Sequence, residues 1–220
     1  MNIYSDIFFW LGGVLTETIP ELTRAALFPE AGGYEAVKMQ QQIRDLIEDL
    51  SLGKITSMQY CEQAIARCES SMTVSGLNRL IIDTASLQQS VADMVVEIPE
   101  ASERWLIVDF PVDWFSELAN RLKIYSLFPE NRAIFTAELK IKRMVPDIFY
   151  HLPPKAGRAM DDCIVIDPVS ARAVEAMKHG LATIIYVYPE RLKHELAMQG
   201  IWQTDAEVLH PTSSERVKIE

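Results

Sequence analysis

The hydrophobic residues of this chain fall into two patterns that alternate along most of its length. Short continuous apolar runs are typical of buried strands, whereas apolar positions three or four residues apart indicate amphipathic helices. The runs predict strands over 7–11, 105–108, 134–136, 163–166 and 181–187, and the periodic segments predict helices over 112–121, 170–179 and 189–199. This alternation favours an α/β fold, with a Rossmann-like parallel sheet flanked by helices.

Residues 16–86 differ, because helical spacing persists there without a strand. Thr56 and Gln59 have the spacing of a capping box at a helix start. The helix that follows should bury one stripe of side chains, namely Met58, Cys61, Ile65 and Cys68. We therefore predict a core made of 1–15 and 87–220, interrupted by a helical insert over 16–86.

Two further helix boundaries follow from local signals. Ser86 and Gln89 have capping-box spacing, which predicts a helix from there to about Val96. A helix is also expected after the strand at 134–136, reaching Lys142 and Arg143, and another should begin at 146–150.

Composition narrows the classes of function and partner. The formal net charge of −10 argues against nucleic acid or an anionic membrane as the main partner. No apolar run approaches the roughly 20 residues of a membrane span, and the first residues lack the basic start of a signal peptide. The three cysteines fit a reducing compartment better than a disulfide framework, so we expect a cytoplasmic protein.

Chemically distinctive residues follow the predicted strands. Trp10, Asp109, Arg143 and Asp167 all fall at or near predicted strand ends. In parallel α/β sheets, ligands bind outside the carboxyl ends of the strands, so these four side chains are the candidate ligand-binding residues. Asp6 precedes its strand and therefore belongs to the opposite edge of the sheet.

The first of these strand ends resembles a known motif. Leu11-Gly12-Gly13-Val14-Leu15 is similar to the first motif of the haloacid dehalogenase (HAD) superfamily, an apolar strand followed by Asp-Leu-Gly-Gly-Val-Leu. Trp10 stands at the position of the family's nucleophilic aspartate, and Gly12 stands where phosphatase members carry the general acid. The resemblance identifies the predicted insert as the helical cap of such proteins.

Later segments continue the resemblance in the expected order. Asp109 stands where the second motif has Ser or Thr, and Arg143 stands at the Lys of the third motif, before Pro146-Asp147-Ile148-Phe149. The fourth motif, Ile-Asp-Asp before a helix, is matched by Ile166-Asp167-Pro168, with proline in place of the second aspartate. The similarity therefore covers essentially the whole chain.

The resemblance implies hydrolysis through an aspartyl intermediate with Mg²⁺ as the cofactor. Trp10 has no carboxylate, so it can neither attack a substrate nor ligate Mg²⁺. None of the family's catalytic positions is then intact, no cofactor is expected, and Asp167 is the only plausible remnant of a metal site. We interpret the chain as a pseudoenzyme that binds a small molecule or a protein, with the oligomeric state open and a dimer among the options. The alternative is a phosphatase or dehalogenase-like hydrolase with a rewired active site.

Structural roles are the competing explanation for the same residues. Trp10 can be a packing residue, Asp109 and Arg143 can form an ion pair, and Asp167 can cap the helix that follows it. Because a buried unpaired charge is costly, we expect the Arg143 guanidinium within salt-bridge distance of Asp109 or Asp167. We expect the Trp10 indole to lie over the former phosphate site.

Overall fold

A five-stranded parallel sheet forms the centre of the computed structural model, which describes residues 4–30, 33–140 and 146–202. The strands are β1 (Asp6–Trp10), β2 (Glu103–Val108), β3 (Ala133–Phe135), β4 (Cys163–Asp167) and β5 (Ala182–Ile185). They are arranged in the order β3-β2-β1-β4-β5, and every pairing is parallel. The predicted fold class is therefore confirmed.

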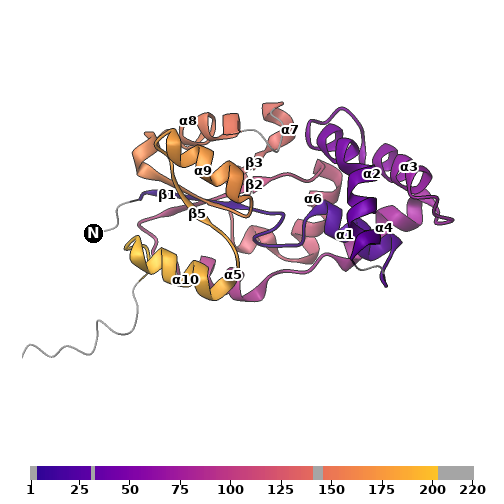
Figure 1. The fold of residues 1–220 in the computed structure, drawn as a ribbon. Helices are drawn as coiled ribbons and strands as arrows, with labels where there is room; N and C mark the ends of the chain where they lie inside the picture. Colours follow the sequence, from indigo (N-terminus) through magenta and orange to yellow (C-terminus); the bar gives the residue numbers. More distant parts are fainter. Residues whose placement is uncertain (1–3, 31–32, 141–145, 203–220) are drawn as a thin grey trace, which may run out of the picture.

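Helices cover both faces of this sheet (Figure 1). The helices α8 (Leu152–Ala156) and α9 (Ser170–Lys178) lie on one face, and α5 (Gln89–Glu97) and α10 (Pro189–Met198) lie on the other. Every residue of β1 and β4 is buried, as expected for central strands with both faces covered. The continuous apolar runs in the sequence reflect this double coverage.

Four helices form a separate bundle beyond the carboxyl edge of the sheet (Figure 1). They are α1 (Ile19–Leu27), α2 (Tyr34–Ser51), α3 (Ser57–Arg67) and α4 (Val74–Thr84). The α1–α4, α2–α3 and α3–α4 pairs pack against each other through buried apolar side chains. This bundle is the helical insert that the sequence predicts, and we call it the cap.

One further helix and several short helical segments complete the described part of the core. They are α6 (Val112–Arg121), η1 (Ile124–Ser126), η2 (Glu130–Arg132), α7 (Thr136–Leu139), η3 (Pro146–Tyr150) and η4 (Met160–Asp162). The prediction that the helix after β3 reaches Lys142 and Arg143 is wrong, because α7 ends at Leu139 and Lys140 has a left-handed backbone with φ of 53°. Lys142 and Arg143 lie outside the described residues.

Two local predictions in the cap region need correction. Ser86 does not cap α5, whose N-cap is Gln88 and has no side-chain hydrogen bond. The predicted stripe on α3 is displaced: Cys61 and Cys68 are buried, but Met58 is 45% exposed, and Tyr60 and Ala64 fill the core instead. The predicted capping box at Thr56 and Gln59 is confirmed.

The two chain segments that join the cap to the core are bonded to each other. The Ser86 amide and hydroxyl donate to the two carboxylate oxygens of Glu17, at 2.9 and 2.6 Å. The Gln88 amide donates to the Leu15 carbonyl at 2.8 Å. Ser86 therefore connects two linkers that are far apart in sequence, a role that a local capping signal could not reveal.

Helix α6 fixes the cap to the core. Trp114 on α6 is 1% exposed, and its ring meets the Tyr60 ring of α3 edge to face at 5.8 Å. Arg121, in the last turn of α6, donates to the carbonyls of Ile82 and Ala85 at 2.5 Å each. Ring packing and hydrogen bonds thus hold the cap in one position.

In the described part of the chain, no helix is long and apolar enough to cross a membrane.

Candidate functional site

The candidate site forms where three adjacent strands end. Trp10 is the last residue of β1, Asp167 is the last residue of β4, and Asp109 directly follows β2. Because β1 lies between β2 and β4 in the sheet, the three residues belong to one edge of the sheet, and that edge faces the cap (Figure 1). The fourth predicted member, Arg143, lies outside the described residues.

Trp10 is part of the buried core. Its side chain is fully buried, and the guanidinium carbon of Arg172 lies 3.7 Å from the centroid of its ring. A guanidinium over an indole face is a favourable cation–π contact, and it is strongest away from water. Among the described residues, the Trp10 Nε1 atom has no hydrogen-bond partner. The indole therefore acts here through its ring face and its volume.

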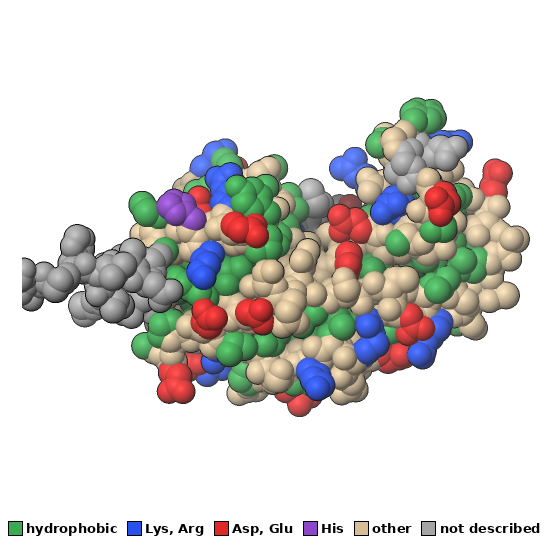
Figure 2. All heavy atoms as spheres, turned by 90° about the horizontal axis from the view of Figure 1, so that it is seen from below, with side chains coloured by type: hydrophobic (Ala, Val, Ile, Leu, Met, Phe, Trp, Pro, Cys, Tyr) green, Lys and Arg blue, Asp and Glu red, His purple; other side chains and the backbone are tan. Residues whose placement is uncertain are grey.

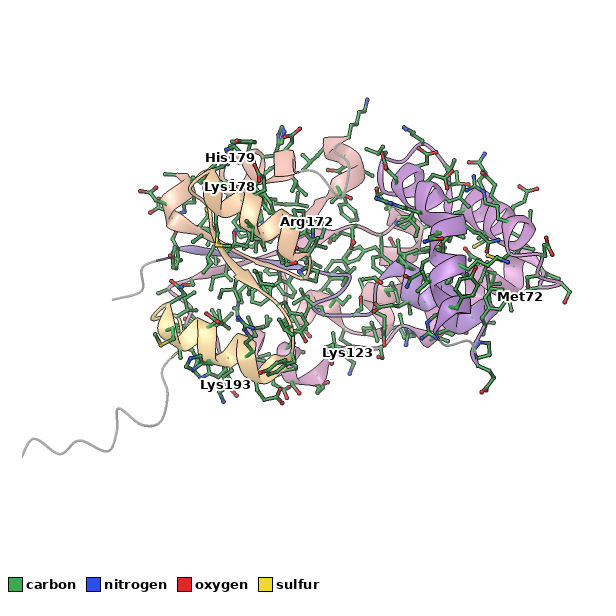
Figure 3. All side chains as sticks on the ribbon, viewed as in Figure 1. Met72, Lys123, Arg172, Lys178, His179 and Lys193 are labelled. Carbon is green, nitrogen blue, oxygen red and sulfur yellow. The ribbon has the colours of Figure 1, made fainter. Side chains whose placement is uncertain are left out.

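Arg172 also binds Asp167. Its Nε donates to Oδ2 at 2.7 Å and its Nη2 donates to Oδ1 at 2.8 Å, so the pair is bidentate. Both side chains are fully buried. Arg172 lies in the first turn of α9, at the end of that helix that faces the cap (Figure 3). Arg172 therefore joins the two strand ends, with the Trp10 ring against its guanidinium face and the Asp167 carboxylate at its edge.

Asp167 has a further local partner. Its Oδ1 accepts the Val169 amide at 2.7 Å, so the carboxylate does contact the start of α9, although the N-cap residue is Val169. Sequence reasoning missed Arg172 as a site residue. The sequence signal that could have found it is an arginine in the first turn of the helix directly after Asp167. Side chains in a helix tilt toward its N-terminus, so this arginine is directed back toward the end of β4.

Asp109 occupies the space beside Gly12. The Gly12 amide donates to Asp109 Oδ1 at 3.2 Å, and the aspartate side chain is buried. A Cβ atom on residue 12 would lie 3.0 Å from Oδ1 and 3.2 Å from Oδ2 of Asp109. Glycine at position 12 therefore allows the carboxylate to approach the backbone of the loop that follows β1.

Gly13 connects this loop to the end of β4. Its φ of +90° is in the region that favours glycine, and a Cβ atom there would lie 3.0 Å from two carbons of Pro168. Its amide also donates to the Thr16 carbonyl at 2.7 Å, which closes the turn. Close packing between the glycine and the proline thus places the loops after β1 and β4 side by side.

The residues present do not fit the Mg²⁺ that the family resemblance implies. Mg²⁺ needs several oxygen ligands in near-octahedral geometry, but Trp10 supplies none. Both oxygens of Asp167 already accept hydrogen bonds from Arg172, and Oδ1 accepts the Val169 amide as well. Within the described ranges, no three His, Cys, Asp or Glu residues are grouped to hold a metal.

A cleft lies between the cap and this edge of the core. Its volume is about 470 Å³, and most of its lining belongs to the cap, including Pro20, Glu21, Arg44 and Ile47, while Val169 contributes from the core. Val37 on α2 is 52% exposed at its wall, and Val169 comes from the loop next to Asp167. In the space-filling view, the core and the cap form two lobes with a notch between them (Figure 2).

Asp6 lies at the opposite end of β1, as the sequence predicts. Its Oδ1 accepts the Trp105 Nε1 at 2.6 Å, and its Oδ2 accepts the Arg158 Nε at 2.9 Å. The carboxylate is 1% exposed. This buried group ties β1 to β2 and to the segment before β4, and it takes no part in the candidate site.

Comparisons with known proteins bear on the fold. No family model matches the chain, and no curated protein sequence matches it. Solved structures do match. A HAD family enzyme from Bacteroides thetaiotaomicron, in complex with magnesium and inorganic phosphate, superposes with a TM-score of 0.65 at 13% identity, covering 94% of this chain and 100% of that chain.

Two other structures extend the comparison. L-2-haloacid dehalogenase from Xanthobacter autotrophicus, with chloropropionic acid covalently bound, has a TM-score of 0.64 at 14% identity and covers 91% of this chain and 85% of that chain. A predicted HAD-like family hydrolase from Porphyromonas gingivalis has a TM-score of 0.68 at 14% identity, with 91% and 100% covered. The chain therefore has the HAD-like fold, as the motif resemblance predicts.

Proposed function

We propose that this chain, which has the HAD-like fold, is a non-catalytic protein that binds a small molecule in the cleft between cap and core. One observation carries the proposal: Trp10, at the position of the family's nucleophile, is fully buried and packed against Arg172. A side chain held in this way leaves no carboxylate to attack a substrate at the end of β1. We further propose the boundaries 16–86 for the cap.

The cleft supports the binding role. Its volume of about 470 Å³ is within the range of small-molecule sites, and its walls combine apolar side chains with polar ones that include Arg44, Glu21 and Glu48. The cap is held to α6 by Trp114 and Arg121, so the positions of the cap and the core that shape the cleft are fixed by contacts within the protein. A preformed apolar cleft loses little free energy to ordering when a ligand enters.

The state of the cysteines is the basis for a proposed cellular location. Cys61, Cys68 and Cys163 are all free and buried. Free thiols are compatible with the reducing cytoplasm, where we place this protein.

A catalytic assay tests the first half of the proposal. We expect no turnover of phosphate monoesters or 2-haloacids by the purified protein, with or without Mg²⁺. Asp109 is the buried carboxylate at this edge that a rewired hydrolase could use, so Asp109→Asn is the matched control variant. Turnover that follows the protein through purification and disappears in Asp109→Asn would support a rewired hydrolase and overturn the proposal.

A binding assay tests the second half. The fluorescent probe anilinonaphthalene sulfonate should bind the native protein, and Val37→Gln should weaken this binding by making one wall of the cleft polar. Val174→Gln, on the exposed side of α9, removes a similarly exposed apolar side chain away from the cleft and should have no effect. Equal effects of the two variants would contradict ligand binding in the cleft.

A further inference from the structure

We propose that the Arg172 guanidinium is a built-in replacement for a divalent cation at the end of β4, so that the site needs no metal and excludes one. The inference rests on the proposed function, since both begin from Trp10. Its readout is metal binding rather than turnover or ligand binding, so each can fail without the other.

Charge compensation is the first reason. The Asp167 carboxylate is fully buried, and a buried charge must be paired to be tolerated. Arg172 supplies this pairing through two hydrogen bonds of 2.7 and 2.8 Å, and its own side chain is equally buried. A bidentate guanidinium neutralises the carboxylate and fixes its orientation, which are the two effects that a bound cation has on such a ligand.

Competition is the second reason. A divalent cation at Asp167 would have to displace hydrogen bonds from Arg172 or share the carboxylate with it. Two cations at about 4 Å in a partly dehydrated site repel each other strongly, and the guanidinium cannot lose its proton at ordinary pH. The arginine is tethered one turn along α9 from the strand end, so its local concentration exceeds that of any free ion.

Trp10, on the neighbouring strand β1, is the third reason, because it takes the place of a second oxygen ligand. Phe9 of β1 pairs with Ile166 of β4, so Trp10 and Asp167 are the next neighbours at the ends of the two strands. A carboxylate at position 10 would therefore lie about 5 Å along the sheet from Asp167. The indole instead presents its face to Arg172 at 3.7 Å. With an aromatic face on one side of the guanidinium and a carboxylate at its edge, the end of β1 supplies no oxygen to share a metal with Asp167.

The test is a double variant that removes the guanidinium and adds a carboxylate at position 10. In Trp10→Asp/Arg172→Ala, the new Asp at position 10 and Asp167 stand at the adjacent ends of β1 and β4 and the competing cation is gone, so we expect the variant to gain binding of Mg²⁺ and Mn²⁺. The wild type should show no thermal shift at 10 mM of either ion. If the dissociation constant of the double variant is about one hundredth of the ion concentration, its unfolding midpoint should rise by about 5–10 °C.

The single variant Trp10→Asp is the matched control. It supplies the second carboxylate but keeps Arg172, so it should not respond to either ion. If the double variant does not fold alone, the same ions should restore its folding on dilution from urea. Metal binding by the wild type tighter than about 1 mM, an equal response of Trp10→Asp, or no effect of metal on the double variant would each overturn the inference.

Discussion

The Nε1 of Trp114 on α6 donates a hydrogen bond of 2.7 Å to Oδ1 of Asn78 on α4. The contact joins the core to the cap at a position where Trp114 is 1% exposed. The Trp114 donor is buried while Asn78 is only partly buried, so the bond satisfies an indole N–H that would otherwise lack a partner in the core. The position of the cap therefore depends on this pair.

Replacing Trp114 by Phe should destabilise the protein by about 1–3 kcal/mol, because the hydrogen bond to Asn78 is lost and the smaller ring leaves a cavity in the core. Chemical denaturation gives the loss of stability. Amide hydrogen exchange should show faster exchange in α4 and α3 than in β1, since the cap loosens first. Trp202→Phe, in a tryptophan stacked under Lys193 next to α10, is the control and should leave the exchange of the cap unchanged. Uniform acceleration in both lobes would contradict the role of Trp114.

The buried carboxylate of Asp6 gives a second prediction. Asp6→Ala removes the acceptor of Trp105 Nε1 and the partner of Arg158, so we expect a loss of about 3 kcal/mol in the free energy of unfolding. Arg158→Ala should cost less, because the arginine side chain is 46% exposed. Urea denaturation of both variants checks the order. A larger loss for Arg158→Ala would show that Asp6 depends on that ion pair rather than on Trp105.

Lys123 offers a stabilising substitution. It follows α6 with φ of 54° and ψ of 37°, a left-handed conformation that disfavours side chains with a Cβ atom. Lys123→Gly should raise stability by about 0.5–1 kcal/mol, measured as a higher denaturant midpoint. Lys178→Gly, at the last helical residue of α9, makes the same change in helical backbone and should lower stability instead. A decrease for both would show that the Lys123 side chain has contacts worth more than the backbone strain.

The buried thiols predict how stability changes at alkaline pH. Burial raises the pKa of the Cys61 thiol and of the Cys163 thiol from 9.0 to about 12. Because the folded-state pKa lies above the unfolded one, the stability linked to these thiols is fully present below about pH 9 and is lost as the pH rises toward about 12. Denaturation between pH 8 and 11 should show this decline.

Replacing both thiols by alanine should flatten that alkaline decline, although each replacement also leaves a small cavity in the core. Reaction with a thiol reagent at pH 8 should be slow in the native protein and fast in urea. Rapid labelling of the native protein would contradict the burial of these groups.

The order of strands and helices could be read from the sequence, because burial on both faces of a strand requires a continuous apolar run and burial on one face of a helix requires a period near 3.6. The ends of β1, β2 and β4 follow from where those runs stop. Trp10, Asp109 and Asp167 could therefore be assigned to one edge of a parallel sheet before any contact was known. Asp6 was placed at the other end by the same logic.

Side-chain partners required the tertiary structure. The expected pairing of Arg143 with Asp109 or Asp167 stays a prediction, because Arg143 lies outside the described residues, whereas the bidentate pairing of Arg172 with Asp167 is seen only in the folded protein. Several cations could reach a strand end, and only packing decides which of them is buried there. The predicted burial of Met58 and the predicted capping role of Ser86 are wrong for a related reason. Local spacing indicates a helix face or a cap, but the neighbouring element decides whether that face is covered and which groups form hydrogen bonds.

The sequence by itself determined that no carboxylate stands at position 10, and the tertiary structure determined which groups surround the tryptophan there. A tryptophan at the end of a strand could have been exposed as a platform for a ligand. In the folded protein, α9 places Arg172 over its ring, and the strand next to β1 places Asp167 at the edge of that guanidinium. This outcome depends on three segments of the chain meeting in space, because a buried charge can be neutralised only by a group that the fold brings to it.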